Sequence, residues 1–119
     1  MADPKICVLV LNWNGADDTI DCIHSLKKVT YNHAEIVVID NGSTDDSVQR
    51  IKKQYGDVII IEIESNLFFG GGNNVGLDWA QKHDFDYVVF LNNDTTVEPD
   101  FLEPLLAGFE HPQNVGMVA

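Results

Sequence analysis

Short apolar runs alternate along this chain with segments of helical periodicity. Residues 6–11, 34–39 and 87–91 are rich in Val and Ile and lack regular polar alternation, which is typical of strands buried on both faces of a sheet. Further apolar segments predict a strand over 58–63 and the start of a fifth strand over 115–119.

Helical spacing fills the intervals between the predicted strands. Apolar residues recur every three or four positions within 16–29, which predicts a helix there. Further helices are expected from a cap at Ser43 or Thr44 to residue 55, from the loop 66–74 to about residue 82, and over 101–110. Because strands and helices alternate, we predict an α/β fold with a mostly parallel sheet, right-handed crossovers and helices on both faces.

Polar clusters stand where the apolar runs end. They occupy residues 12–15, 40–43 and 92–94, after the first, second and fourth predicted strands. Ligands of open parallel sheets bind beyond the carboxyl ends of the strands. Since Asp40 and Asp94 belong to these clusters, the pattern predicts a nucleotide and metal site on one rim of the sheet.

Composition narrows the class of protein. A chain of 119 residues fits one small domain, and 45% hydrophobic residues are enough for a packed core. A formal net charge of -12 argues against a nucleic-acid-binding surface, which needs clustered Lys and Arg. An acidic protein still binds a phosphate ligand where a divalent cation, backbone N–H groups or a further segment supplies positive charge.

The two cysteines and the N-terminal residues bear on location. Cys7 and Cys22 match neither a metal-ligand spacing nor a disulfide framework, so we expect free thiols in a reducing compartment. Nothing at the N-terminus resembles a signal peptide, and no apolar run approaches the ~18 residues that span a bilayer. These observations favour a cytoplasmic protein.

Asp94 is the first candidate for chemistry. It follows a buried strand, and with Asn92 and Asn93 it forms an oxygen-ligand set suited to Mg²⁺ or Mn²⁺. The same residues are also typical of a plain polar turn, because Asn and Asp favour turns. The position of a second carboxylate, Asp40, at the end of another strand favours the metal site.

Asp40 and its neighbours form the second candidate site. A carboxylate at the end of the second strand can accept hydrogen bonds from a base N–H or a ribose hydroxyl. Alternatively, Asp40 is a turn or cap residue, since Asn41-Gly42-Ser43 resembles a tight turn. The two roles are compatible.

Two further features have both a functional and a plain structural interpretation. Residues 70–72 are consecutive glycines ahead of the third predicted helix, where backbone can approach a phosphate closely, although a flexible turn has the same composition. They are not a P-loop, because no Gly-Lys-Ser/Thr follows. Trp13 can stack on a base between the amides of Asn12 and Asn14, or it can pack half-buried against the first helix.

Four motifs follow one another along the chain: VLNWNG at 10–15, VIDNGSTD at 38–45, NLFFGGGNNVG at 66–76, and LNNDT at 91–95 with PDFL at 99–102. In these motifs and their order, nearly the whole chain resembles the family 2 glycosyltransferases of GT-A fold. The residues of these motifs are most similar to those of the bacterial rhamnosyltransferase-type branch. The resemblance implies that residues 1–119 are the Rossmann-like, N-terminal, donor-nucleotide-binding part of a catalytic domain.

The resemblance also assigns roles to individual residues. Asp40 would bind the uracil or thymine edge with Trp13 near the base, and Asp94 would be the metal ligand at the donor diphosphate. Asn92 takes the first position of the family's Asp-x-Asp motif, so it would join Asp94 around Mn²⁺ or Mg²⁺ as a weaker, neutral ligand. The nucleotide pocket would be lined by Asn12, Trp13, Asn14, Asp40, Asn41, Gly71, Gly72, Asn74, Asn92 and Asn93.

The implied reaction moves a sugar from a UDP- or dTDP-sugar to an acceptor hydroxyl, with the metal neutralising charge on the leaving diphosphate. The carboxylate base and the acceptor pocket would lie in the family's second half, so no catalytic residue is predicted in this chain. We expect it to bind nucleotide weakly and to transfer no sugar alone. By the resemblance, the acceptor is a glycan or a lipid-linked molecule of polysaccharide biosynthesis, which implies action at the cytoplasmic membrane.

The end of the chain is the basis for a further expectation. It falls inside the predicted fifth strand, so we expect the 119 residues to be the first half of a longer domain. A sheet cut there leaves an unpaired edge, which favours a homodimer.

Two other classes of protein fit parts of the pattern. A non-catalytic α/β module that binds Mg²⁺ or a nucleotide would use Asp40 and Asp94, yet the first strand ends in Asn12 rather than in the acidic pair of a receiver domain. A sugar nucleotidyltransferase would need a glycine-rich loop with Lys or Arg after the first strand, and residues 12–15 supply neither.

Overall fold

The computed structural model of the protein describes residues 3–109, which form one parallel sheet with helices on both faces. The strands run in the spatial order β3-β2-β1-β4, and every neighbouring pair is parallel. Their bounds are β1 Ile6–Asn12, β2 Ala34–Asn41, β3 Ile59–Ile63 and β4 Tyr87–Asn92. The predicted α/β class and parallel sheet are therefore confirmed.

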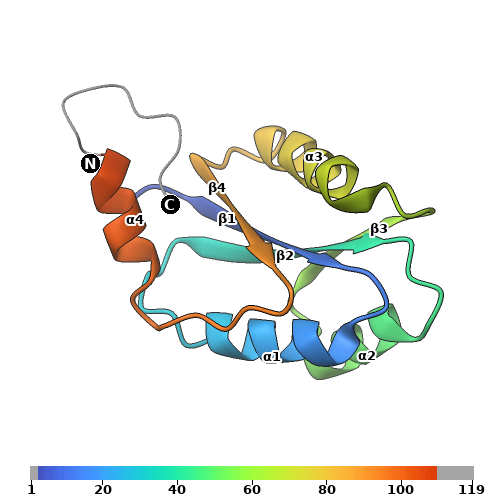
Figure 1. The fold of residues 1–119 in the computed structure, drawn as a ribbon. Coiled ribbons are helices and arrows are strands. Elements are labelled where there is room, and N and C mark those ends of the chain that lie inside the picture. The colour runs from blue at the N-terminus through green and yellow to red at the C-terminus, as the bar shows by residue number, and fades with distance from the viewer. Residues whose placement is uncertain (1–2, 110–119) are drawn as a thin grey trace.

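Four helices connect and follow the strands. They are α1 Ala16–Leu26, α2 Ser47–Gln54, α3 Phe68–Gln81 and α4 Leu102–Phe109. Figure 1 shows α3 on one face of the sheet, α1 and α2 on the other, and α4 near the amino ends of the strands. No helix within residues 3–109 has the length and apolar character needed to cross a membrane. The predicted strand over 115–119 and the last residue of the predicted fourth helix lie outside the described residues.

The central strand β1 explains the two layers. Its alternate residues Ile6, Val8 and Val10 are buried in the cluster that includes α1 and α2 side chains, whereas Cys7 and Leu9 are buried in the cluster beneath α3. Because successive side chains of a strand point to opposite faces, an apolar run without polar alternation fills both cores. Burial on both faces is thus confirmed for β1.

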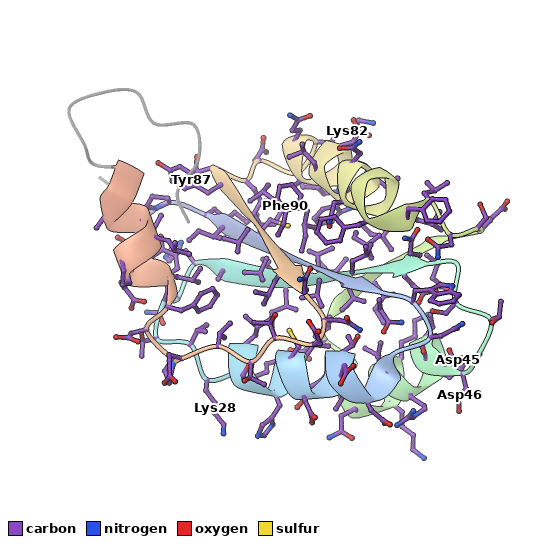
Figure 2. The ribbon with its side chains drawn as sticks, in the orientation of Figure 1. Lys28, Asp45, Asp46, Lys82, Tyr87 and Phe90 are labelled. Atoms are coloured by element: carbon purple, nitrogen blue, oxygen red, sulfur yellow. The ribbon has the colours of Figure 1, made fainter. Side chains whose placement is uncertain are left out.

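The outer strand β4 is less buried than its sequence predicts. Phe90 is 47% exposed, although it lies in an unbroken apolar run. Figure 2 shows Phe90 on the side of β4 toward α3. The expectation of burial on both faces is wrong here because, among the described residues, β4 ends the sheet and α3 lies mainly over β1 and β2.

Helix α3 begins earlier than predicted. The sequence predicts a glycine-rich loop over 66–74, but the helix starts at Phe68 and therefore contains all three consecutive glycines. Gly72 and Gly76 lie on its buried face, and a Cβ at Gly76 would stand 2.9 Å from Leu9 Cδ2. These two glycines let the helix approach the sheet closely, which is a packing role that the sequence pattern does not distinguish from a ligand loop.

We predict opposite stability effects for two alanine substitutions in α3. At Gly72 a Cβ would lie 2.6 Å from Leu11 Cδ1 and 3.0 Å from Asn41 Nδ2, so Gly72→Ala should lower the free energy of unfolding by about 1–3 kcal/mol. At Gly70 no atom lies within 4 Å, so Gly70→Ala should raise it by up to about 1 kcal/mol through helix propensity. Urea unfolding followed by circular dichroism measures both; equal effects would contradict this packing.

Candidate functional site

The strand register gathers the predicted site on one rim of the sheet. Asn12 stands opposite Asp40 between β1 and β2, Asp40 stands opposite Glu62 between β2 and β3, and Leu11 stands opposite Asn92 between β1 and β4. The polar clusters that follow β1, β2 and β4 therefore lie together at the carboxyl ends of parallel strands, as the sequence predicts.

Asp40 is a nearly buried carboxylate with fixed partners. It is 4% exposed, and its Oδ1 accepts hydrogen bonds from Asn12 Nδ2 at 3.0 Å and Ser43 Oγ at 2.7 Å. Its Oδ2 accepts from the Ser43 backbone N–H at 3.2 Å. A carboxylate has about four acceptor positions, so Oδ2 keeps one acceptor position that no described donor uses.

The side chain of Asn12 holds the Asp40 carboxylate in place through a hydrogen bond. Its side chain is fully buried, its Nδ2 donates to Asp40 and, at 3.3 Å, to Ser43 Oγ, and its Oδ1 accepts from Thr19 Oγ1 at 2.6 Å. The amide is therefore directed at its neighbours and not at solvent. The structure thus uses Asn12 to hold Asp40, and the predicted contact of Asn12 with a base stays a prediction.

Asn14 joins the loops that follow β1 and β2. Its Oδ1 accepts from the backbone N–H groups of Thr44 at 2.8 Å and Asp45 at 3.2 Å, and its own N–H donates to Ser43 Oγ at 2.9 Å. Its φ is 49°, a left-handed conformation that Asn adopts more readily than most residues. Because Ser43 and Thr44 serve this junction, neither caps α2, which begins at Ser47 after Asp46. The predicted cap is therefore wrong.

Asn41 fixes the segment that leads into α3. The residue is 2% exposed; its Nδ2 donates to Asn66 Oδ1 and to the Phe68 carbonyl, both at 3.0 Å, and its Oδ1 accepts from the Leu67 N–H at 2.9 Å. Gly42 has a φ of +76°, and a Cβ there would lie 2.5 Å from the Ser65 carbonyl carbon. Glycine is required at this close crossing.

The metal-site candidates divide into one inward and two outward side chains. Asn93 Nδ2 donates to Thr19 Oγ1 at 3.2 Å and to the Gly15 carbonyl at 3.5 Å. Asn92 and Asp94 are exposed, and neither makes a side-chain hydrogen bond to another described residue. The structure therefore leaves Asn92 and Asp94 available for a ligand and uses Asn93 to hold the turn.

The donor set fits a hard divalent cation with an incomplete protein shell. Asp94 offers carboxylate oxygens and Asn92 an amide oxygen, which suit Mg²⁺ or Mn²⁺. Within residues 3–109 no three His, Cys, Asp or Glu side chains are grouped to enclose a metal. A cation here would take its remaining ligands from water and from a bound diphosphate, as Mg²⁺ commonly does.

The remaining predicted residues occupy different surroundings. Trp13 is 52% exposed, which fits both the predicted base stacking and the alternative of half-buried packing, so its role stays a prediction. Asn74 is exposed on α3, whereas Gly72 is buried against the sheet and Gly71 stands over Leu67 in the preceding turn. The helix thus presents Asn74 to solvent and keeps Gly72 for packing.

Sequence reasoning missed three features of this rim. Thr19 and Ser43 hold the site side chains, but a hydroxyl within a helix or a turn carries no distinctive sequence signal. Phe68 is 78% exposed with a φ of 62°, an unusual backbone conformation for a bulky side chain. Asn73 is 7% exposed and its Oδ1 has no partner among the described residues.

The thiol of Cys22 is close enough to Asp94 to be affected by its charge. Both cysteines are free, as predicted, and the structure also buries both side chains. Burial, and then the negative charge of Asp94, raise the pKa of the Cys22 thiol to about 11; burial, with Glu35 as a second cause, raises the pKa of Cys7 to about 12. Neither thiol is therefore ionised near neutral pH.

Comparison with known proteins gives concordant matches. The family model described as glycosyl transferase family 2 matches residues 7–119. A poly-beta-1,6-N-acetyl-D-glucosamine synthase of Staphylococcus aureus is 28% identical over 95% of this chain and 27% of its own length. Glycosyltransferase GlyA of Streptococcus pneumoniae is 33% identical over 88% of this chain and 15% of its own length. The chain thus spans about a quarter or less of these curated relatives.

Solved structures share the fold. Staphylococcus aureus TarS in complex with UDP-GlcNAc has a TM-score of 0.77 and 26% identity, covering 89% of this chain and 31% of that chain. The mannosyltransferase PcManGT of Pyrobaculum calidifontis, in complex with GDP-Man and Mn²⁺, has a TM-score of 0.72 and 20% identity, covering 94% and 34%. These neighbours agree with the predicted Rossmann-like, GT-A arrangement.

We predict that Asn41 matters for the stability of the rim. Asn41→Ala removes three hydrogen bonds and leaves the Leu67 N–H without its partner, so the free energy of unfolding should fall by about 2–4 kcal/mol. The matched change Asn74→Ala, on an exposed residue, should stay within about 0.5 kcal/mol. Denaturant unfolding gives both values, and faster amide exchange at Leu67 should accompany the first alone.

We also predict that stability falls in alkali through the thiols. Their folded pKa values of about 12 and 11 exceed the unfolded value of about 8.5. The contribution is complete below pH about 8.5 and is lost as pH rises, on the order of 1–2 kcal/mol per thiol by pH 10. Urea unfolding from pH 7.5 to 10 should show a shallower decline for Cys22→Ala than for the unmodified chain. Parallel declines would refute this.

Proposed function

Because the chain belongs to glycosyl transferase family 2, we propose that its rim binds the nucleotide-sugar donor of a transfer to an acceptor hydroxyl. The observation that carries this proposal is the state of Asp40. It is a nearly buried carboxylate at a strand end, held by Asn12 and Ser43 with acceptor capacity left on Oδ2. Such a group recognises a ligand that presents an N–H donor.

The chemistry of Asp40 favours a uracil or thymine base. Both bases carry one ring N–H between two carbonyl groups, which matches an acceptor with a single remaining position. Trp13 is more than half exposed on the loop after β1 and offers a flat surface for stacking. A TarS structure holds UDP-GlcNAc. These points support a UDP- or dTDP-sugar donor for the present chain, and the wording of its motifs supports a rhamnosyltransferase-type branch.

The diphosphate of the donor would lie at the turn after β4. Asp94, with Asn92 as a neutral ligand, would hold Mn²⁺ or Mg²⁺ there, and the bound cation would neutralise charge on the departing diphosphate. A cation is needed because the chain carries 19 acidic residues against seven Lys and Arg. Asn93 would keep the turn in place through Thr19 and the Gly15 carbonyl.

We propose that deprotonation of the acceptor and acceptor binding are carried out by residues outside 1–119. The chain covers 27% of the Staphylococcus aureus synthase, so we place the carboxylate base and the acceptor pocket elsewhere. We propose a glycan or lipid-linked acceptor at the cytoplasmic face of the membrane; the two reduced cysteines are in keeping with that compartment. We also propose a homodimer through the exposed edge of the sheet.

We predict metal-dependent nucleotide binding that depends on both carboxylates. Calorimetric titration should show UDP or dTDP binding strengthened by Mn²⁺. Asp94→Asn should abolish the Mn²⁺ enhancement, and Asp40→Asn should weaken binding about tenfold or more because a charged acceptor is lost.

Asp84→Asn provides the matched control for this titration. It removes the same charge at a turn before β4, at the amino end of the strand whose carboxyl end Asp94 follows, and Asn tolerates the left-handed φ of 61° there. It should bind as the unmodified chain does. Equal losses of Mn²⁺-enhanced binding in Asp84→Asn and Asp94→Asn would overturn the proposed function. It would also be overturned if neither the unmodified chain nor a chain extended to the length of its relatives binds nucleotide.

A further inference from the structure

A continuous chain of hydrogen bonds crosses the site beneath its surface. Asn93 Nδ2 donates to Thr19 Oγ1 at 3.2 Å, Thr19 Oγ1 donates to Asn12 Oδ1 at 2.6 Å, and Asn12 Nδ2 donates to Asp40 Oδ1 at 3.0 Å. The four residues come from the turn after β4, from α1 and from the ends of β1 and β2. Thr19 and Asn12 are completely buried.

The direction of this chain is determined by its charged end. Asp40 as a carboxylate only accepts, so Asn12 must present its amino group to Asp40 and its carbonyl to Thr19. The single hydroxyl proton of Thr19 then goes to Asn12, which leaves the hydroxyl oxygen to accept from Asn93. The amino group of Asn93, which also donates to the Gly15 carbonyl at 3.5 Å, is thus connected through Thr19 and Asn12 to the charge of Asp40 and stands next to the proposed metal ligand Asp94.

Thr19 is the link on which this relation depends. Its hydroxyl has one proton to donate and an oxygen to accept, and the structure uses both, at 2.6 and 3.2 Å. Hydrogen bonds that share a hydroxyl in a buried site polarise one another, so a change at one end is felt at the other. A valine of similar shape would keep the packing and remove the link.

We propose that Thr19 is a positioning residue that couples the base-recognising carboxylate of Asp40 to the metal-binding turn at Asn93 and Asp94. This inference rests on the proposed function where it names the ligands, but the coupling itself is a property of the ligand-free chain. Its consequence is that Thr19 adds to the mutual strengthening of nucleotide and Mn²⁺ binding, beyond the direct contact between the cation and the diphosphate.

The coupling is tested first without ligand. In ¹⁵N-labelled protein, Asp40→Asn removes the charge that polarises these hydrogen bonds but keeps an acceptor oxygen for Asn12, and the side-chain NH₂ resonances of Asn93 should shift. In a Thr19→Val background the same change should leave them unmoved, and in Thr19→Ser the shift should return. A shift of equal size in the valine background, or none in the unmodified background, would overturn the inference whatever the ligand proves to be.

Titration of UDP with and without Mn²⁺ is the second test. Thr19→Val should weaken binding about tenfold or more and reduce the mutual enhancement, as loss of a supporting partner commonly does; Thr19→Ser should restore both to within about threefold. Ser47→Ala is the matched control, because it removes a buried hydroxyl that takes no part in the hydrogen bonds from Asn93 to Asp40. It should bind normally.

The two proposals fail in distinguishable ways. If the unmodified chain and an extended chain bind no nucleotide, the proposed function fails, and the Asn93 resonances alone decide the coupling. If the unmodified chain binds and Thr19→Val keeps the full Mn²⁺ enhancement, the coupling is wrong and the donor site stands. Should Thr19→Val not fold, Asn93→Ala removes the last hydrogen bond of the series, and it must reduce the Mn²⁺ enhancement for the inference to hold.

Discussion

A carboxylate placed inside a protein must be surrounded by donors, and the rim of this sheet is arranged around that need. Asp40 is 4% exposed and has no Lys or Arg partner among its hydrogen bonds; it is satisfied by the Asn12 amide and by Ser43. Burying an unpaired charge costs several kcal/mol, so these neutral donors cannot be dispensable. Their positions in turn determine the loops that follow β1 and β2.

The same principle extends outward from Asp40. Ser43 also accepts the Asn14 N–H, and Asn14 receives two backbone N–H groups of the next loop. Asn41 does the equivalent work between β2 and the start of α3. Asparagine suits these junctions because one short side chain both donates and accepts. The rim is thus held by side chains at the ends of β1 and β2 and in the loops that follow these strands.

Most of the fold follows from the sequence because apolar runs and helical periodicity report local structure directly. The strands β1 to β4 and their parallel order agree with the expected pattern, and the register brings Asn12, Asp40 and Asn92 to one rim. The sequence predicts a loop at the glycines of α3, and this is wrong because a close helix–sheet contact and a ligand loop require the same residue. The division between inward Asn93 and outward Asn92 depends on long-range contacts with Thr19, which no local pattern contains.

The hydrogen bonds between the loops of the rim join mostly uncharged amide and hydroxyl groups, and this determines how the site responds to ionic strength. The ion pairs of the surface, such as Lys82 with Asp78 at 3.0 Å, join exposed side chains and weaken as ionic strength rises. The amide and hydroxyl bonds that shape the rim are dipolar, short-ranged and mostly shielded from solvent, so counter-ions do not screen them. A rise in ionic strength would therefore weaken the attraction of a charged ligand and leave the positions of the rim side chains unchanged. In this small acidic domain, ligand attraction and site geometry thus respond separately to salt.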